Sequence, residues 1–286
     1  MLTKITTAVL CAAVLASGAA RAETAAPPAA APAYDIQALY DVTLLGFSVG
    51  TIQMDLKLHD GLYEVHAYVR PDGLASMITA NTVNAVANGM GGLGAVTPNS
   101  SWIQQISSKR TQTVTIQYKD GDPISMEADP VYEINQWTPA EALTKATYDP
   151  MSAVLAMMLI PTAGPGEKAC GTSIPIYDGK RVYAFDMWSD GMTDVKRGAG
   201  GYNGQALHCV VGYRRIAGWD AEHIAKASNT KIEVLFAPIG KGAYGGPAFY
   251  LPVRLWSDAE VGDVVAVPKR VTINGKDWGK FFAEGG

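Results

Sequence analysis

Charged side chains are scarce in this sequence: Asp, Glu, Lys and Arg together make up 17% of its 286 residues. The formal net charge is −4, and the few pairs of basic residues are scattered, among them Lys109-Arg110, Lys180-Arg181, Lys196-Arg197 and Arg214-Arg215. Proteins that bind nucleic acid concentrate Lys and Arg on one surface. The composition therefore disfavours a nucleic-acid partner.

Histidine is also rare, because the chain has only four, and none stands in an H-E-x-x-H or H-x-H spacing. A zinc site needs several His, Cys or carboxylate ligands at such short spacings. Asp186 and Asp190 could meet across a loop as the carboxylate pair of a glycosidase, but acidic loop residues are more often only solvated. We therefore expect no metal site and no catalytic residue from these groups.

Long apolar runs are missing beyond the N-terminus. Lys4 gives the N-terminus a positive charge, Ala8 to Ala19 is apolar but too short to span a bilayer, and Ala20-Arg21-Ala22 is a small-x-small cleavage site. Residues 1–22 are thus predicted to be a secretory signal peptide cleaved near Ala22, which places the mature protein in the periplasm, not across the membrane. Residues 23–33 are Ala/Pro-rich and predicted to be a disordered spacer. Residues 34–286 are predicted to form a single β-rich domain.

Cysteine is limited to three residues, of which Cys11 lies within the signal peptide. The other two, Cys170 and Cys209, would enter a compartment that oxidises thiols, so we expect them to form a disulfide. A catalytic thiol would need a paired base and a metal site would need further ligands, and both remain as alternatives.

Alternation of apolar and polar residues with period two runs through most of the mature chain and predicts strands. In the first expected hairpin the apolar faces are Ile52, Met54, Leu56 and Leu58 before a turn at Asp60-Gly61, and Tyr63, Val65, Ala67 and Val69 after it. Further strands are expected over residues 111–118, 174–177, 181–187, 207–213, 231–236, 251–256 and 264–273. Asx-Gly pairs follow several of these strands, at Asp120-Gly121, Asp178-Gly179 and Asn274-Gly275, and favour an antiparallel sheet over βαβ units.

Few helices are expected. Thr138 with Pro139 and Glu141 matches a capping box that opens a short helix. Asp149-Pro150 repeats the cap, and the helix after it carries one apolar stripe, ended by Pro161, that should lie across a face of the sheet: Met151, Val154, Leu155, Met158 and Leu159. A third candidate helix runs from Gly73 to about Asn88.

Two glycine motifs invite a functional interpretation. Gly46 to Gly50 spells G-x-S-x-G, the nucleophile elbow of serine hydrolases, and His208 and His223 follow it. The residues after Gly50 alternate as a strand, whereas an elbow needs a helix there, so we interpret the motif as a bend between strands. Gly89 to Gly94 matches the dinucleotide motif G-x-G-x-x-G, but it follows the third candidate helix and not a strand. We interpret it as a loop and expect no cofactor.

The order of several segments resembles the periplasmic proteins grouped as domain of unknown function 3108. These segments are "YDVTLLGFSVGTI" (40–52), "YEVHAYVRPDGLASMI" (63–78), "YDPMSAVLAMM" (148–158), "IYDGKRVYAFDM" (176–187), "ALHCVVGYRRIAGW" (206–219) and "YLPVRLW" (250–256). The resemblance implies a mainly β fold, a large antiparallel curved or spiral sheet of half-barrel type with a few short helices packed on one face. It implies no catalytic residues.

We interpret the chain as a non-enzymatic protein of the cell envelope that binds a lipid, acyl chain or apolar segment in the concavity of the sheet and supports envelope integrity or biogenesis. The candidate lining residues are Ile52, Met54, Leu56, Tyr63, Val65, Met151, Leu155 and Met158, for which packing in the core is the competing interpretation. The alternatives are a structural partner of another envelope protein and, with less support, a hydrolase of an envelope polymer.

Overall fold

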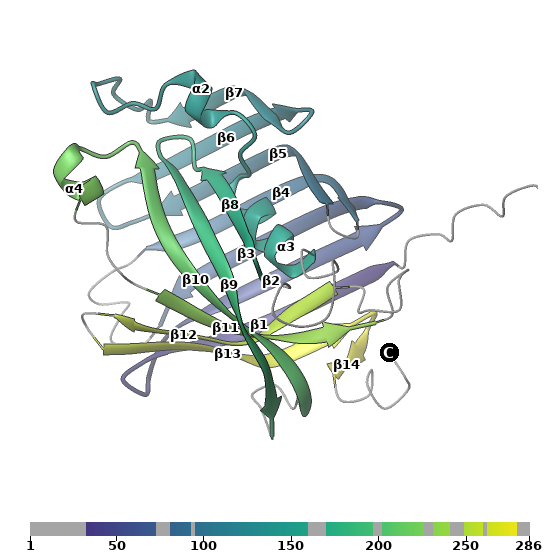
Figure 1. Ribbon diagram of the computed structural model, residues 1–286. Coiled ribbons are helices and arrows are strands. Elements are labelled where there is room, and N and C mark those ends of the chain that lie inside the picture. The colour runs from purple at the N-terminus through teal and green to yellow at the C-terminus, as the bar shows by residue number, and fades with distance from the viewer. Residues whose placement is uncertain are drawn as a thin grey trace, which may run out of the picture. The chain divides into compact units, whose positions relative to one another are not determined.

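Antiparallel strands make up most of the structure, a computed structural model that describes residues 33–72, 81–92, 95–159, 170–196, 202–225, 231–240, 249–259 and 262–278 (Figure 1). The predicted signal peptide and all but the last residue of the predicted spacer lie outside this part. Residues from Ala31 to Gly286 form one compact unit. The antiparallel sheet predicted from the alternating pattern is confirmed.

The strands form one sheet of 14 strands in the order β7-β6-β5-β4-β3-β2-β1-β13-β12-β11-β10-β9-β8, with β14 beside β13. It consists of two meanders joined where β1 pairs with β13. The first meander contains β1 (Tyr34–Leu44), β2 (Phe47–His59), β3 (Leu62–Pro71), β4 (Thr82–Gly92), β5 (Ala95–Ile106), β6 (Thr111–Lys119) and β7 (Asp122–Asp129). The second contains β8 (Thr172–Tyr177), β9 (Val182–Val195), β10 (Gly204–Ala217), β11 (Lys231–Ile239), β12 (Phe249–Ala259), β13 (Gly262–Ile273) and β14 (Lys276–Asp277).

Asx-Gly turns set the register of three hairpins, as the sequence predicts. Asp60-Gly61, Asp120-Gly121 and Asn274-Gly275 all have positive φ at both residues, for example 52° at Asp60 and 76° at Gly61. This is the twist that two-residue hairpins require. Leu45-Gly46 turns the β1–β2 hairpin in the same way, with φ of 51° and 84°.

The predicted helix over residues 73–88 is wrong where the structure describes it, because β4 begins at Thr82 and pairs with both β3 and β5. Residues 73–80 lie outside the described part. Gly89 to Gly92 belong to this strand and not to a loop. The sequence interpretation also missed β5 and β7. In β4 an Ala-rich stretch of modest hydrophobicity becomes a strand because its neighbours on both sides supply hydrogen-bonding partners, a tertiary effect that overrides local propensity.

Three short helices lie among the described residues: α2 (Glu141–Thr144), α3 (Pro150–Leu159) and α4 (Ala221–Ala225). The capping box predicted for the first is wrong, since α2 begins at Glu141 and its N-cap residue, Ala140, has no capping side chain. The Thr138 hydroxyl instead accepts a hydrogen bond from the backbone N–H of Asn135.

The cap of α3 is confirmed: Asp149 accepts hydrogen bonds from the backbone N–H groups of Met151 (2.9 Å) and Ser152 (3.0 Å). The Ser152 hydroxyl also bonds to the Asp149 carboxylate and lies 2.6 Å from the hydroxyl oxygen of Tyr63 on β3. A buried polar chain thus ties the start of α3 to the sheet.

Helix α3 is enclosed more completely than a single stripe predicts. Ser152, Ala153 and Ala156 are buried together with Leu155, Met158 and Leu159, and no residue of the helix is exposed. The helix contacts β3, β4 and β5 on one side and β8 and β12 on others, and Figure 1 shows α3 beside β8. A helix that is apolar all round needs such enclosure.

A second apolar cluster forms where the two ends of the sheet approach each other. It joins Val114, Ile116 and Tyr118 of β6 to Tyr177 of β8 and Val182 of β9. Close approach requires Gly179, whose φ is +88° and where a Cβ atom would lie 2.5 Å from the Val114 Cγ1 atom. The sheet remains open, because β7 and β8, its end strands, are not paired with each other.

The packing of α3 makes a prediction for stability. Leu155→Ala and Met158→Ala should each lower the free energy of unfolding by about 2–5 kcal/mol, because both side chains are fully buried and truncation leaves a cavity. Leu62→Ala, the same change at a side chain that is 59% exposed, should cost less than about 1 kcal/mol. Urea denaturation of the three variants measures this. Similar small losses at all three sites would show that α3 does not pack in a core.

The Asp149 carboxylate makes a prediction for pH dependence. Burial raises its pKa from 3.8 to about 6, against hydrogen bonds from Ser152 and Met151 that lower it. Between pH 3.8 and about pH 6, Asp149 keeps its proton in the folded protein but has released it in the unfolded chain. The preference of the folded protein for the protonated carboxyl therefore stabilises it fully below pH 3.8, and this contribution disappears as the pH rises through 6. The shift corresponds to about 3 kcal/mol at most.

Asp149→Asn cannot titrate at this position and is the matched control. From pH 4 to pH 7 the free energy of unfolding of the wild type should fall relative to that of Asp149→Asn, as measured by urea denaturation at each pH. A difference between the two proteins that stays constant over this range would contradict the assignment.

Candidate functional site

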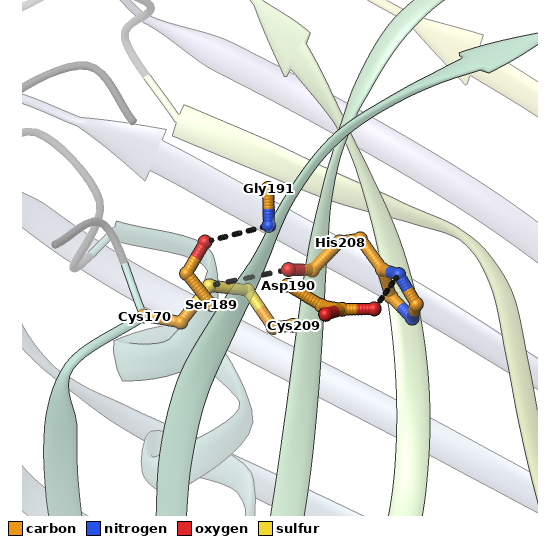
Figure 2. Close-up of a disulfide and its surroundings, with 6 residues drawn as sticks. All are labelled: Cys170, Ser189, Asp190, Gly191, His208 and Cys209. Carbon is orange, nitrogen blue, oxygen red and sulfur yellow. Dashed lines mark hydrogen bonds and ion pairs between the residues drawn. A yellow bond between two sulfur atoms is a disulfide. The ribbon is translucent and has the colours of Figure 1, made fainter. Parts of the chain in front are cut away.

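The predicted disulfide is present between Cys170 and Cys209, whose Cα atoms are 5.9 Å apart (Figure 2). Cys170 lies just before β8 and Cys209 lies on β10, so the bond spans β9, which runs between these two strands. Both residues are fully buried beside α3 in the main core. The disulfide therefore fastens the edge of the second meander from its inner face.

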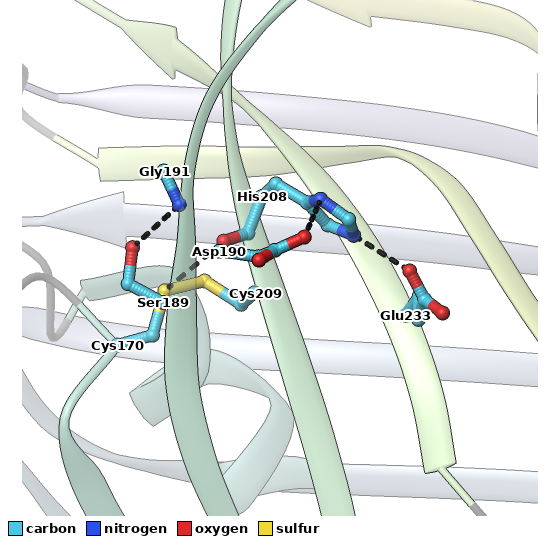
Figure 3. Close-up of polar contacts among 7 residues, drawn as sticks. All are labelled: Cys170, Ser189, Asp190, Gly191, His208, Cys209 and Glu233. Carbon is cyan, nitrogen blue, oxygen red and sulfur yellow. Dashed lines mark hydrogen bonds and ion pairs between the residues drawn. A yellow bond between two sulfur atoms is a disulfide. The ribbon is translucent and has the colours of Figure 1, made fainter. Parts of the chain in front are cut away.

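His208 fastens the same strands from the outer face, because neighbouring residues of a strand point to opposite sides. Its Nδ1 atom lies 3.1 Å from the Asp190 carboxylate and its Nε2 atom 2.8 Å from that of Glu233, on β9 and β11 (Figure 3). Trp256 stacks on the ring with 5.3 Å between centroids. Asp190 and Gly191 together stand opposite His208 in a β-bulge, which turns Asp190 toward the imidazole.

The residues considered for catalysis are each engaged elsewhere. Ser48 lies in β2 and not before a helix, and its hydroxyl donates a hydrogen bond to Asp41. Both ring nitrogens of His208 face carboxylates, and His223 pairs with Asp220. The interpretation of G-x-S-x-G as part of a bend between strands is confirmed.

The pattern G-x-S-x-G has a structural cause at each glycine. Gly46 occupies the positive-φ position of the β1–β2 turn. Gly50 lies so close to β3 that a Cβ atom there would be 2.7 Å from the carbonyl oxygen of Arg70. Between them, a bulge interrupts the register of β1 and β2.

Asp186 and Asp190 both lie on β9 and pair with different partners. Asp186 accepts hydrogen bonds from Arg214 (2.6 Å) and Ser173 (2.6 Å), and the Arg214 guanidinium is the main reason that its pKa is lowered. Asp190 pairs with His208. A carboxylate held ionised in an ion pair is a poor general acid, which argues against a glycosidase pair here. Among the described residues, no group of three or more His, Cys, Asp or Glu side chains is arranged to hold a metal ion.

The eight candidate lining residues all belong to the main apolar core cluster or pack against it. Six are buried in the main core, while Ile52 and Met151 pack against it partly buried: the six are Met54, Leu56, Tyr63, Val65, Leu155 and Met158. The two largest cavities described below are lined by other residues. A ligand beside α3 thus remains a prediction.

The largest of the described cavities is a cleft of about 790 Å³ at the end of the sheet where β6 and β7 approach β8 to β10. We call it the end cleft. Its walls come from Met126 to Ala128 of β7, the segment 131–139, the β8–β9 turn at 177–181, and residues 218–223 after β10. The volume lies within the usual range of ligand pockets, about 300–1,000 Å³.

Aromatic rings in contact with cationic side chains form much of the wall of the end cleft. The Trp219 ring lies near two guanidinium groups, Arg181 at 5.1 Å and Arg215 at 5.6 Å. The Lys180 ammonium lies 5.2 Å from the Tyr132 ring. Val131 and Ile134 at the rim are 84% and 89% exposed. Large apolar side chains this exposed, grouped beside a cleft, are typical of a binding surface.

A second hollow of about 460 Å³ shares Tyr132, Lys180 and Arg181 with the end cleft. Its other lining residues are mostly polar and include Arg110, Gln112 and Asp178. We call it the basic hollow. Burial raises the pKa of Asp178, although the backbone N–H groups of Lys180 and Arg181 bond to its carboxylate.

Sequence reasoning missed both cavities. The basic pairs interpreted as scattered are brought together, since Arg110, Lys180, Arg181 and Arg215 come from three of them. Segment 131–139 has neither helical nor strand periodicity, so it gave no signal of its own. The sequence feature that could have revealed the end cleft is the presence of Trp137 and Trp219 in connecting segments, because large aromatic residues in loops are more often part of a binding surface than of a core.

Residues 39–267 match the family model described as "Protein of unknown function (DUF3108)". No curated protein matches the chain in sequence. A crystal structure of a beta-barrel-like protein of domain of unknown function DUF1849 from Brucella abortus is 11% identical over 84% of this chain and 97% of its own, with a TM-score of 0.48. MucB in complex with MucA(peri) gives 8% identity over 84% of this chain and 89% of its own, with a TM-score of 0.14. Within the described residues, no helix has the length and hydrophobicity to cross a membrane.

The G-x-S-x-G motif makes a prediction for the stability of variants at Gly50 and Ser48. Gly50→Val should destabilise the fold by about 1–3 kcal/mol, because the new side chain collides with the backbone of β3. Ser48→Ala removes only an exposed hydrogen bond and should change stability by less than about 0.5 kcal/mol. Thermal melts compare the two variants. Labelling of Ser48 by a fluorophosphonate probe would contradict the structural interpretation.

Proposed function

The chain belongs to the DUF3108 family, whose function is unknown, and from its structure we propose that it is a non-enzymatic envelope protein of the periplasm that binds an acyl chain in the end cleft. The observation that carries this proposal is the cleft itself, a volume of about 790 Å³ with aromatic walls and exposed aliphatic side chains at its rim. The apolar part of this surface gains by covering a hydrocarbon chain.

The location of the cleft supports a modified form of the sequence interpretation. The concave side of the sheet was the expected binding surface, but α3 and the core side chains occupy its centre. The end cleft lies at one end of the same concave side, beyond the second apolar cluster. A ligand can therefore bind there without displacing α3.

A non-enzymatic role is supported by the chemistry of the polar groups. Ser48 donates to a carboxylate, and His208 is enclosed by carboxylates and Trp256 with only 13% of its side chain exposed. Export to the periplasm rests on residues 1–22 of the sequence. The alternative, a structural partner that is a protein, becomes the conclusion if acyl compounds fail to bind.

The proposal predicts that the mature protein binds laurate below its critical micelle concentration and dodecanol below its solubility limit, measured by displacement of the uncharged probe N-phenylnaphthylamine. Ile134→Glu should weaken the binding of both by about tenfold, because a carboxylate at the rim must be desolvated against the chain.

Ile124→Glu is the matched control for this measurement. Ile124 lies on the neighbouring strand β7 and is 62% exposed, but it does not line the end cleft. The same change there should leave binding within about twofold, since a carboxylate outside the cleft stays in water and is not desolvated against the chain. If neither laurate nor dodecanol binds to the wild type, or if both variants bind equally well, the acyl-chain proposal is wrong.

A further inference from the structure

The basic hollow and the end cleft are neighbours that share one wall. Tyr132, Lys180 and Arg181 line both of them; the other residues of the hollow are mostly polar, and the cleft holds most of the aromatic and aliphatic residues together with Glu127, Glu133 and Asp220. A molecule that filled both cavities would need a polar head joined to an apolar chain. The pair of cavities thus has the amphipathic character of a lipid.

The sign of the charge in the hollow is positive. Three cations line it, Arg110, Lys180 and Arg181, against a single carboxylate, that of Asp178. The excess of two positive charges stands out in a chain whose formal net charge is −4. None of the three cations forms an ion pair with a carboxylate within the described ranges; Lys180 and Arg181 instead lie over the rings of Tyr132 and Trp219.

Hydrogen bonds fix the backbone of the two turns that carry these cations before any ligand binds. The Asp178 carboxylate accepts hydrogen bonds from the N–H groups of Lys180 (2.9 Å) and Arg181 (2.7 Å), so it fixes the turn that carries both side chains. Ser107 does the same for Arg110, because its hydroxyl accepts from the Arg110 N–H (3.1 Å) and donates to the Arg110 carbonyl (2.8 Å). Fixed turns lower the entropy lost on binding.

Tyr132 lies on the wall shared by the cavities, and both Arg110 and Arg181 affect the pKa of its hydroxyl. Burial raises the pKa of the Tyr132 hydroxyl and Asp178 raises it further, whereas both guanidinium groups act in the opposite direction. Arg110 lines the hollow together with Tyr132, and Arg181 lines both cavities, so both cations are available where the head of a ligand would meet its chain. Guanidinium groups suit carboxylate and phosphate oxygens because they offer paired N–H donors.

We propose that the basic hollow binds the anionic head group, a carboxylate or a phosphate, of the molecule whose acyl chain occupies the end cleft. The inference rests on the proposed function and narrows its ligand to an anionic amphiphile. Arg110 binds the head group from the side of the hollow, and Lys180 and Arg181 bind it at the junction. An uncharged chain of the same length gains nothing from these groups.

The test compares laurate, dodecyl phosphate and dodecanol by displacement of N-phenylnaphthylamine, with inorganic phosphate titrated separately by calorimetry. The wild type should bind both anions about tenfold more tightly than dodecanol, and raising the ionic strength should reduce only this preference. Arg110→Gln should abolish most of the preference and leave dodecanol binding unchanged, since Arg110 lines the hollow but not the cleft.

Lys109→Gln is the matched control, because Lys109 is the exposed neighbour of Arg110 and does not line the hollow. It should retain the full preference for anions. Lys180→Gln tests the junction and should reduce the preference as Arg110→Gln does. Thermal melts of all the variants confirm that each is folded.

The outcomes separate the two proposals. Equal binding of all three alkyl compounds would overturn the head-group site and leave the acyl-chain proposal standing. Failure of all three to bind would overturn the acyl-chain proposal and this inference with it. If inorganic phosphate bound as tightly as dodecyl phosphate, the hollow would be a site for free phosphate, and the inference of one shared ligand would be wrong.

Discussion

The enclosure of α3 is the constraint on which the rest of the structure depends. Ser152 is the only polar side chain among its ten residues, and none of the ten is exposed to solvent. Leaving such a helix on one face of a flat sheet would expose about half of its apolar surface to water. The sheet therefore curves until β8 and β12 cover the side that β3 to β5 leave open. The polar chain from Asp149 through Ser152 to Tyr63 fixes the helix within this enclosure.

Curvature around a helix of only ten residues has a second consequence, because the strands are longer than the helix. Beyond the end of α3 the two ends of the sheet approach each other directly, and the cluster of Val114, Ile116, Tyr177 and Val182 fills the space. Next to this cluster, segment 131–139 and the residues after β10 line the end cleft. The end cleft and the basic hollow thus lie where the sheet is too long for the helix it encloses.

These relations explain which features could be predicted from the sequence. Hairpins at Asp60-Gly61 and Asn274-Gly275 and the cap at Asp149 depend on residues close together in the chain, and all were predicted correctly. The disulfide was predictable because only two cysteines lie outside the predicted signal peptide. Strand β4 was mistaken for a helix because its state depends on β3 and β5, not on its own residues. The cavities join residues 110, 132, 180 and 219, and no local pattern reveals which distant turns will meet.

Strands β9 and β10 connect the core to the cavities. Near Cys209 they are fastened on the inner face by the disulfide and on the outer face by His208 between Asp190 and Glu233. At the other end the same strands carry Val182 and Ala217 into the second cluster and lead into Arg181 and Trp219 in the end cleft. A paired strand is stiff along its length, so fastening one end of β10 limits the positions open to the other. The spacing of the cleft walls is therefore set by the contacts that close the sheet over the helix.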